Sequence, residues 1–228
     1  MKIAVLKGGL SAEREVSLCS GATVAKALRE GGHEVEEIDV TGPDFAVAPK
    51  TEVVFLALHG TFGEDGQVQT ILERMSLPYT GSGVESSRLA FDKVATKKAF
   101  QAAGVPTPLC TIMKKGGSAI PRLKQDFPWV VKPSKQGSSV GVTIVQKEQD
   151  LEKAIGLAFE SDDEILIEAF IPGRELTIAV LGDEALKIVE IEPKSGWYDY
   201  QHKYTKGATE YLVPAPLTNH QELCLQNL

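Results

Sequence analysis

Short apolar segments alternate with longer amphipathic segments at the start of the chain, and this alternation restricts the fold more than any other feature. The predicted strands cover residues 2–6, 34–38 and 53–58, and the predicted helices cover about 13–29 and 66–75. Such an order is typical of a parallel sheet, because each parallel pair of strands needs a crossover connection. We therefore expect an N-terminal parallel-sheet α/β domain over residues 1–92, with Ser11 as the N-cap of its first helix.

The pattern changes after residues 104–108, where prolines follow a helix predicted over 92–103. Further strands are predicted over 129–132, 142–145, 164–168, 175–180 and 185–191, with one helix over about 148–159. This order indicates an α+β arrangement with long antiparallel strands. Residues 194–209 form a polar loop rich in aromatic side chains. Thr218 and Gln221 fit a capping box that opens a final short helix.

Charge and composition exclude several classes of protein. The chain has 24 Lys and Arg against 31 Asp and Glu, which gives a net charge of −7. A chain this acidic is a poor general binder of nucleic acid, although a local basic pocket for a small phosphate ligand is compatible with it. No apolar run reaches the roughly 20 residues of a membrane span. Cys19, Cys110 and Cys224 fit no metal or disulfide spacing, and there is no signal peptide, so we expect a cytoplasmic location.

The segment at residues 137–141, GSSVG, lies between two predicted strands and follows Lys132. Glycines let backbone N–H groups approach a phosphate closely, and the serine hydroxyls add donors. Lys132 can place a cation on the same phosphates. The segment is not a Walker P-loop, because no Gly-Lys-Ser/Thr follows and no helix is predicted to start there. A flexible hairpin explains the same spacing, so both interpretations stay open.

His59 and Glu13 each follow a predicted strand of the N-terminal sheet. Ligands of open α/β sheets bind at the carboxyl ends of the strands, and helix N-termini favour anions. The two side chains can therefore face one crevice. Taken alone, His59 also fits a capping role, and Glu13 also fits a solvated first turn. Residues 81–86 half match a dinucleotide-binding fingerprint, but the third glycine is absent, so a turn is the better interpretation.

Two further segments have compositions that suit a ligand site. Residues 198–204 read YDYQHKY. This segment is either a lid that closes over a ligand or a surface Ω-loop packed on itself. Residues 168–175 carry acidic side chains on both sides of an apolar turn. That arrangement can hold a purine edge and a ribose, and it also fits a plain strand–turn–strand.

Six segments, taken together, resemble one family. They read GGLSAEREVSLCSG (8–21), LALHGTFGEDG (56–66), PYTGSGV with a later DK (78–93), VVKPSKQGSSVGV (130–142), IEAFIPGRELTIAVL (167–181) and YDYQHKYTKGATEY (198–211). In this order they resemble the D-alanine–D-alanine ligases, ATP-grasp enzymes of peptidoglycan precursor synthesis. The resemblance implies an N-terminal α/β domain (1–92) that holds the first D-alanine and an ATP-grasp central domain (93–180). It also implies the start of a C-terminal ATP-grasp domain (181–228) with a lid over 194–209.

The resemblance also implies roles for individual residues. Glu13 would bind the ammonium group of the first D-alanine, and His59 would lie near its carboxylate. The implied ATP-binding residues are Lys93, Lys132, Gly137, Ser138, Ser139, Gly141, Glu168, Phe170, Ile171, Glu175 and Lys203. Glu13, Ser138 and Tyr204 would form a catalytic hydrogen-bonded set that latches the lid. We expect Glu168 and Glu175 to lie on adjoining strands of the central domain, facing the same cleft as Lys132.

ATP is thus the implied cosubstrate, with two Mg²⁺ or Mn²⁺ ions as cofactors, D-alanine as substrate and a homodimer as the assembly. The family's Arg-x-Asp, Glu-x-Asn and Gly/Ser segments, which carry metal ligands and the second D-alanine site, have no counterpart in residues 1–228. We therefore expect a C-terminally truncated ligase with no metal ligands and no measurable turnover. One alternative is an ATP-grasp fragment that binds nucleotide or D-alanine without catalysis. The other, a D-alanine–D-lactate type ligase, is disfavoured by the pair Lys203 and Tyr204.

Overall fold

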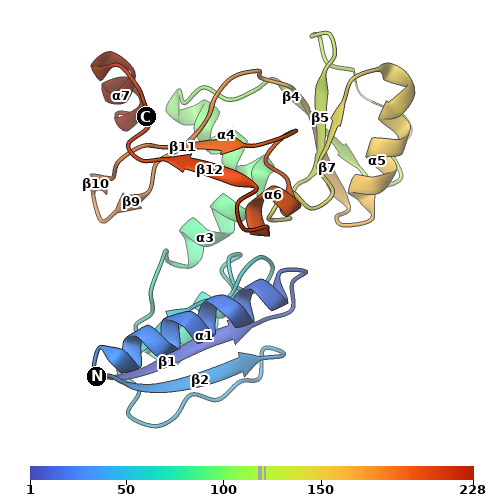
Figure 1. Cartoon of the computed structure of the whole chain (residues 1–228). Helices are drawn as coiled ribbons and strands as arrows, with labels where there is room; N and C mark the ends of the chain where they lie inside the picture. The colour runs from blue at the N-terminus through green and yellow to red at the C-terminus, as the bar shows by residue number, and fades with distance from the viewer. Residues whose placement is uncertain (118–119, 121) are drawn as a thin grey trace.

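The computed structural model describes residues 1–117, 120 and 122–228. Its elements are β1 (Lys2–Gly8), α1 (Arg14–Glu30), β2 (Glu34–Val40), β3 (Val53–Leu56), α2 (Gln67–Arg74), α3 (Val84–Phe91), α4 (Lys93–Ala103), β4 (Cys110–Lys114), β5 (Trp129–Pro133), β6 (Thr143–Val145), η1 (Glu148–Asp150), α5 (Leu151–Phe159), β7 (Glu164–Ala169), β8 (Glu175–Thr177), β9 (Val180–Leu181), β10 (Glu184–Ala185), β11 (Val189–Pro193), α6 (Tyr200–Tyr204), β12 (Thr209–Leu212) and α7 (Asn219–Gln226). The larger sheets have the strand orders β2-β1-β3, β4-β7-β5-β6 and β12-β11-β8. Figure 1 shows the first of them, in blue, below the other two.

The N-terminal sheet is parallel and is covered on both faces. β1 pairs in parallel with β2 on one side and with β3 on the other. Val5 packs against α1 residues such as Ala25, whereas Leu6 packs against α2 residues such as Leu72. Because successive side chains of a strand point to opposite faces, burial on both faces requires the centre of β1, residues 3–6, to be apolar. The predicted parallel α/β domain is confirmed in this respect.

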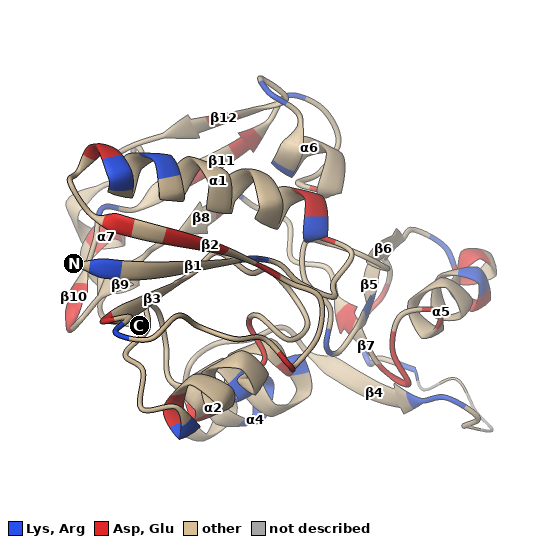
Figure 2. Ribbon diagram, turned by 90° about the horizontal axis from the view of Figure 1, so that it is seen from below, with Lys and Arg blue, Asp and Glu red and all other residues tan. Residues whose placement is uncertain are grey.

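β2 is an edge strand whose side chains are mostly acidic (Figure 2). Glu37 pairs with Lys7 and Arg29, and Asp39 pairs with Arg14 at 2.6 Å. These pairs hold the pKa of both carboxyls below the usual range, chiefly through the hydrogen bonds from Lys7 to Glu37 and from Arg14 to Asp39. Charged side chains on an exposed edge discourage pairing with another chain.

The central sheet is antiparallel, and α5 covers one of its faces. Trp129 and Val131 of β5 pack with α5 residues, together with Ile165 and Ile167 of β7. The alternation of a strand directs the intervening residues, Lys132 and Glu168 among them, to the opposite face. This face is therefore the one on which a polar site can form.

The third sheet differs from the sequence prediction. A continuous strand over 175–180 is wrong, because β8 ends at Thr177 and β9 and β10 form a separate antiparallel pair. The predicted strand over 185–191 is displaced to Val189–Pro193. β8 pairs with β11, in the third sheet, so Glu175 does not lie on a strand adjoining that of Glu168. This expectation is wrong because the exposed turn at residues 170–174 carries the chain from one sheet to the other.

Two local predictions need correction. Ser11 is not the N-cap of α1: Glu13 occupies that position, without a side-chain cap. The Ser11 hydroxyl instead accepts a hydrogen bond from Glu13 N at 3.1 Å and donates to His59 O at 2.7 Å. The lid segment, residues 194–209, is not a loop throughout, because it contains α6. The N-terminus of α6 is capped by Asp199, whose side chain accepts from His202 N.

Candidate functional site

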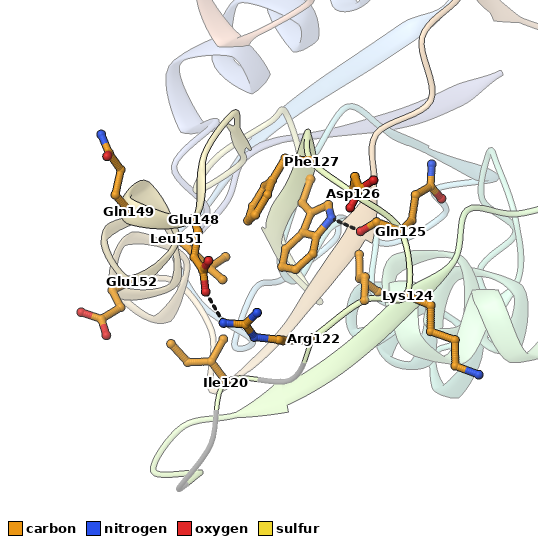
Figure 3. Close-up of a pocket in the computed structure, with 12 residues that line it drawn as sticks. Ile120, Arg122, Lys124, Gln125, Asp126, Phe127, Glu148, Gln149, Leu151 and Glu152 are labelled. Carbon is orange, nitrogen blue, oxygen red and sulfur yellow. Dashed lines mark hydrogen bonds and ion pairs between the residues drawn. The ribbon is translucent and has the colours of Figure 1, made fainter.

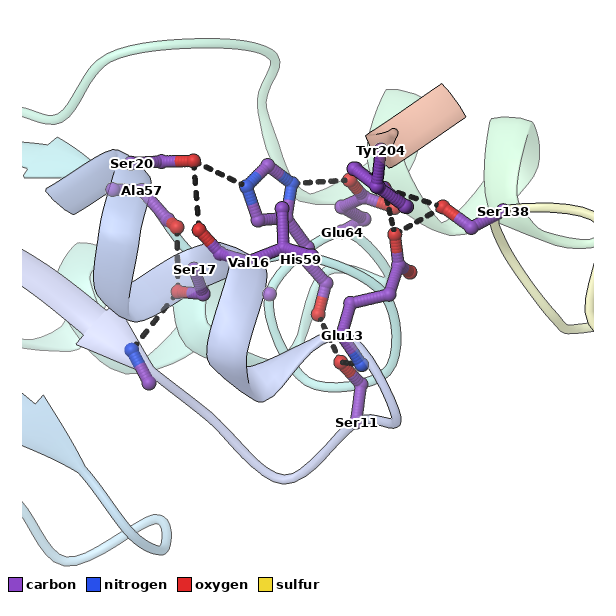
Figure 4. Close-up of polar contacts among 12 residues, drawn as sticks. Ser11, Glu13, Val16, Ser17, Ser20, Ala57, His59, Glu64, Ser138 and Tyr204 are labelled. Atoms are coloured by element: carbon purple, nitrogen blue, oxygen red, sulfur yellow. Dashed lines mark hydrogen bonds and ion pairs between the residues drawn. The ribbon is translucent and has the colours of Figure 1, made fainter. Parts of the chain in front are cut away.

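The structure brings together the side chains of Glu13, Ser138 and Tyr204, as expected from the sequence (Figure 4). Glu13 is 5% exposed and lies at the start of α1. Its Oε1 accepts hydrogen bonds from Ser138 Oγ and, at 2.8 Å, from Tyr204 OH, and the two hydroxyl oxygens are 2.7 Å apart. The three residues come from the N-terminal unit, the phosphate loop (residues 137–141) and the lid segment. Their role as a latch stays a prediction.

The second oxygen of Glu13 has different surroundings. Among the described residues, no hydrogen bond to Oε2 is found, whereas Oε1 accepts two. Gly60 and Gly137 lie beside Oε2, and a Cβ atom at either position would come within 2.9 Å of it. The backbone at both glycines thus approaches this oxygen so closely that no side chain fits at either position. A carboxylate oxygen without a protein donor can accept from a ligand's donor groups.

The phosphate loop has an unusual backbone conformation and contacts the lid segment. Ser138 and Ser139 have φ values of 47° and 62°, in the left-handed region that non-glycine residues adopt at a cost of about 1–3 kcal/mol. Ser139 Oγ donates to Tyr198 O at 3.2 Å. Partial burial raises the pKa of Tyr204 to about 12, so its phenol remains a donor at neutral pH. The loop and the lid segment thus contact each other at two points.

His59 lies near Glu13 and has polar contacts with Ser20 and Glu64 (Figure 4). Its Nε2 is 3.4 Å from Ser20 Oγ, and its Nδ1 is 3.8 Å from Glu64 Oε1. The hydrogen bond to Glu64 raises the pKa of His59, against the opposing effect of burial, and Glu13 adds to the rise. These surroundings therefore favour a protonated imidazole near a carboxylate. This pair of opposite charges suits a ligand that carries both an amino group and a carboxylate.

A second cluster of charges lies on the face of the central sheet opposite α5. In the register of β5 and β7, Val130 is opposite Glu168 and Lys132 is opposite Leu166. Lys132 and Glu168 are thus diagonal neighbours on one face, close enough for long side chains to meet. Lys132 Nζ is 2.5 Å from Glu168 Oε2, and Lys97 Nζ of α4 is 2.9 Å from Glu168 Oε1.

Lys93 lies beneath the residues that lead into the phosphate loop. It is the first residue of α4, whose N-cap is Asp92. Lys93 Nζ donates to Gln136 O at 2.6 Å and to Ser134 O at 3.3 Å. Burial, together with the positive charge of Lys132, lowers the pKa of Lys93 to about 8. An anion bound beside Lys93 would stabilise its charged form.

The remaining predicted nucleotide residues lie near the junction of the two antiparallel sheets. Phe170 follows β7, and its backbone N–H donates to Pro128 O at 3.1 Å. Ile171 is 61% exposed in the turn that leads to Glu175 on β8. Lys203 lies over the ring of Tyr198, with Nζ 5.2 Å from the ring centroid.

A cavity of about 230 Å³ adjoins the charged cluster, and its lining includes Lys93, Lys97, Lys132 and Glu168. A larger cavity, of about 740 Å³, lies elsewhere, between the segment at 122–127 and α5 (Figure 3). Arg122 and Glu148 pair with each other there, and the Trp129 indole donates to Gln125 O at 2.8 Å. None of the site residues predicted from the sequence lines this larger cavity.

Three residues of these sites were missed by sequence reasoning. Glu64 contacts His59 in the loop before α2, and Lys97 contacts Glu168. Ser17 is fully buried and accepts from Gly8 N at 2.9 Å while donating to Ala57 O at 2.6 Å, which ties α1 to β1 and to the chain after β3. Glu64 had a signal, since it lies five positions after His59 in the same loop. Lys97 and Ser17 look like ordinary helix residues in the sequence.

Two negative findings hold for the described part of the chain. No group of three or more His, Cys, Asp or Glu side chains lies close enough together to hold a metal ion. Among the same residues, no helix combines the length and the apolar character needed to cross a bilayer.

Comparison with known proteins gives consistent results for sequence and fold. A family model described as "D-ala D-ala ligase C-terminus" matches residues 100–228, and one described as "D-ala D-ala ligase N-terminus" matches residues 41–82. A D-alanine–D-alanine ligase of Syntrophotalea carbinolica is 53% identical over 219 residues, which are 95% of this chain and 71% of the relative.

Two crystal structures of a D-alanine–D-alanine ligase from Bacillus anthracis have the same fold. The first has a TM-score of 0.84 at 32% identity and covers 100% of this chain and 76% of that structure. The second, complexed with ATP, has a TM-score of 0.82 at 28% identity and covers 100% of this chain and 75% of that structure. The predicted fold class, an α/β unit followed by ATP-grasp sheets, is confirmed by this likeness.

Proposed function

The chain belongs to the D-alanine–D-alanine ligase family, and on that premise we propose that it binds ATP and the first of two D-alanines, which are joined through a D-alanyl phosphate. The observation that carries the proposal is the position of Glu13. Its Oε1 is held by Ser138 and Tyr204, whereas its Oε2 lies close to two glycines and accepts no hydrogen bond from the described residues. One carboxylate thus links the phosphate loop and the lid segment to a small cationic ligand.

The proposed chemistry has two steps. A carboxylate oxygen of the first D-alanine attacks the γ-phosphorus of ATP, the bond to the β-phosphate oxygen breaks, and ADP leaves. The amine of the second D-alanine then attacks the acyl carbon, loses a proton and displaces inorganic phosphate. Both steps depend mainly on alignment of the reactants and on compensation of phosphate charge.

Glu13 and His59 are proposed to hold the first D-alanine. The ammonium group would donate to Glu13 Oε2, and the carboxylate would lie near the His59 imidazole, whose raised pKa favours the charged form. Charge-assisted hydrogen bonds of this kind are about twice as strong as neutral ones.

The nucleotide is proposed to lie over the central sheet. Lys93, Lys132 and the phosphate loop, through Gly137, Ser139 and Gly141, would contact the phosphates, and Lys203 would approach the γ-phosphate from the lid segment. Glu168 would accept from the adenine amino group, with Phe170 and Ile171 beside the ring and Glu175 on the ribose. The position of Lys132, which has one acceptor in the described residues, and the low pKa of Lys93 support an anion site here.

Three other expectations stay proposals. The described residues contain no ligand set that fits the Mg²⁺ or Mn²⁺ ions of the family, so the charge that this chain offers to phosphate comes from its lysines. The homodimer is testable by light scattering during gel filtration, and the cytoplasmic location by fractionation of cells.

Binding measurements on paired variants test the proposal. We expect calorimetry to detect binding of ATP and of D-alanine, but not of L-alanine. Glu13→Gln should abolish binding of D-alanine and leave the affinity for ATP within about twofold of the wild-type value. Lys132→Met should weaken binding of ATP by about tenfold or more and leave binding of D-alanine unchanged. Equal loss of both ligands in either variant would contradict two separate sites.

The acyl phosphate is testable by isotope transfer in any reaction that forms D-alanyl-D-alanine. With D-alanine labelled with ¹⁸O in its carboxylate, the released phosphate should contain one ¹⁸O atom. Unlabelled phosphate, measured by mass spectrometry, would contradict the intermediate.

A further inference from the structure

Lys97 is a buried lysine that forms three contacts within the protein. The residue is 7% exposed. Its Nζ donates to Thr107 Oγ1 at 2.7 Å and to Pro108 O at 2.8 Å, and it is 2.9 Å from Glu168 Oε1. An ammonium group has three N–H donors, so these contacts satisfy all of them. Lys97 therefore has no donor left for a ligand.

Lys132 contacts the same carboxylate but is held less firmly. Its side chain is 23% exposed, against 9% for Lys97, and Glu168 is the only acceptor found for it in the described residues. A bound phosphate can draw Lys132 away from Glu168 Oε2 while Glu168 Oε1 keeps its contact with Lys97. If Lys97 moved away, Thr107 and Pro108 would each lose a donor.

We propose that Lys97 is a positioning residue that holds the Glu168 carboxylate oriented toward the nucleotide base while Lys132 contacts the phosphates. The inference rests on the proposed function, in which Glu168 accepts from the adenine amino group. Without Lys97, transfer of Lys132 to a phosphate would leave the buried Glu168 carboxylate with no counter-charge, which is strongly unfavourable. With Lys97 present, one carboxylate and one lysine can act on opposite ends of the nucleotide at once.

Selectivity for the nucleotide base can be used to measure this role of Lys97. Adenine presents a donor at N6, whereas the hypoxanthine of ITP presents an acceptor, O6, at the same position. A Glu168 carboxylate that is oriented toward the base favours ATP and repels ITP. The ratio of the two dissociation constants therefore measures the state of Glu168 separately from phosphate binding, which is common to both nucleotides.

The test compares Lys97→Met with Lys98→Met, a matched change at the exposed neighbouring residue of α4. Calorimetry with ATP and with ITP should show that the wild-type chain prefers ATP. Lys97→Met should reduce that preference by about tenfold, Lys97→Arg should restore most of it, and Lys98→Met should leave it unchanged. Equal weakening of ATP and ITP in Lys97→Met would mean a structural role and would overturn the proposal.

A second variant keeps the test valid if Lys97→Met does not fold. Lys97→Gln removes the charge but keeps an amide donor for Thr107 or Pro108, and we expect the same loss of preference. Retention of the wild-type preference in a folded Lys97→Gln protein would overturn the role of Lys97 alone. Equal affinity of the wild-type chain for ATP and ITP would instead contradict the proposed contact between Glu168 and adenine.

Discussion

At the scale of residues, the two oxygens of one carboxylate can have different roles. Glu13 presents Oε1 to two hydroxyls of the protein and leaves Oε2 beside Gly60 and Gly137. Two fixed donors restrict rotation of the carboxylate, so the second oxygen is held in position before a ligand arrives. This preorganisation lowers the entropic cost of binding a small molecule.

Glu64 is predicted to control the protonation of His59. The hydrogen bond to Glu64 is the main cause of the raised His59 pKa, so Glu64→Gln should lower it. The charged imidazole is present below its pKa, and binding of D-alanine should weaken as the pH rises through that value. The loss should therefore begin at a lower pH in the variant. The His59 Cε1 proton resonance, followed by NMR, reports the pKa, and Asp65→Asn is a control in the same loop. An unchanged titration in Glu64→Gln would contradict the assigned cause.

Lys93 is predicted to take up a proton when the nucleotide binds. Its pKa in the free chain is about 8, below the ordinary value of 10.5. Phosphate charge raises it again, so the affinity should fall as the pH rises above about 8, by up to about tenfold per pH unit. Calorimetry at pH 9 in buffers of different ionisation enthalpy counts the protons. Lys93→Met should remove the uptake, and uptake that persists in this variant would assign the effect to another group.

The sequence motifs identify the predicted ligand-binding residues but not all of the residues that contact and position them. Glu13, His59, Ser138 and Tyr204 were identified because they belong to segments that resemble the family. Lys97 was not, because its contacts with Thr107, Pro108 and Glu168 arise only when α4 packs against the central sheet. A lysine on a helix has no sequence signature of burial, since lysine is normally exposed.

At the scale of elements, prediction succeeded where burial produces a strong pattern. β1 is apolar because both of its faces are covered, whereas β4, which was not predicted, is a half-exposed edge strand with a weak pattern. α3 was also missed, because residues 81–86 have the composition of a turn, and its N-cap is Gly83 without a side-chain cap. Here tertiary packing, rather than local preference, determines the structure.

Gly137 gives a prediction at the scale of the phosphate loop. Its φ is not in the left-handed region, but a Cβ atom would lie 2.9 Å from Glu13 Oε2. Gly137→Ala should therefore displace Glu13 or the phosphate loop and weaken binding of D-alanine by about tenfold. The free energy of unfolding should change by less than about 1 kcal/mol. Gly156→Ala in α5, where a Cβ atom meets nothing within 4 Å, is the matched control and should stabilise by about 0.5–1 kcal/mol. Denaturant titration and calorimetry measure the two effects. Wild-type affinity in Gly137→Ala would show that the close approach of Gly137 to Glu13 Oε2 is not needed for binding of D-alanine.

At the scale of the whole molecule, the site exists only because three sheets are assembled around it. Ser138 is 125 positions from Glu13 in the chain, and Tyr204 is 191 positions from Glu13. The central sheet orients Lys132 and Glu168, the N-terminal sheet orients His59, and the third sheet carries the lid segment between β11 and β12. A local sequence pattern contains no information on contacts between residues so far apart in the chain. The geometry of the site therefore follows only from the folded structure.

This assembly predicts that nucleotide and D-alanine bind cooperatively. Phosphates that order the phosphate loop and the lid segment also fix Ser138 and Tyr204, which hold Glu13 Oε1. The dissociation constant for D-alanine should therefore fall in the presence of a non-hydrolysable ATP analogue, by about tenfold for a typical coupling of 1–3 kcal/mol. Because coupling of binding free energies is reciprocal, D-alanine should increase the affinity for the analogue by the same factor.

Ser138→Ala removes one of the two hydrogen bonds to Glu13 Oε1 and should reduce the coupling to about threefold or less. Ser86→Ala, at an exposed position of α3, should preserve the coupling. Calorimetric titration of each ligand with and without the other measures the full cycle. Equal affinity for D-alanine with and without the analogue in the wild-type chain would show that the contacts to Glu13 do not connect the two sites.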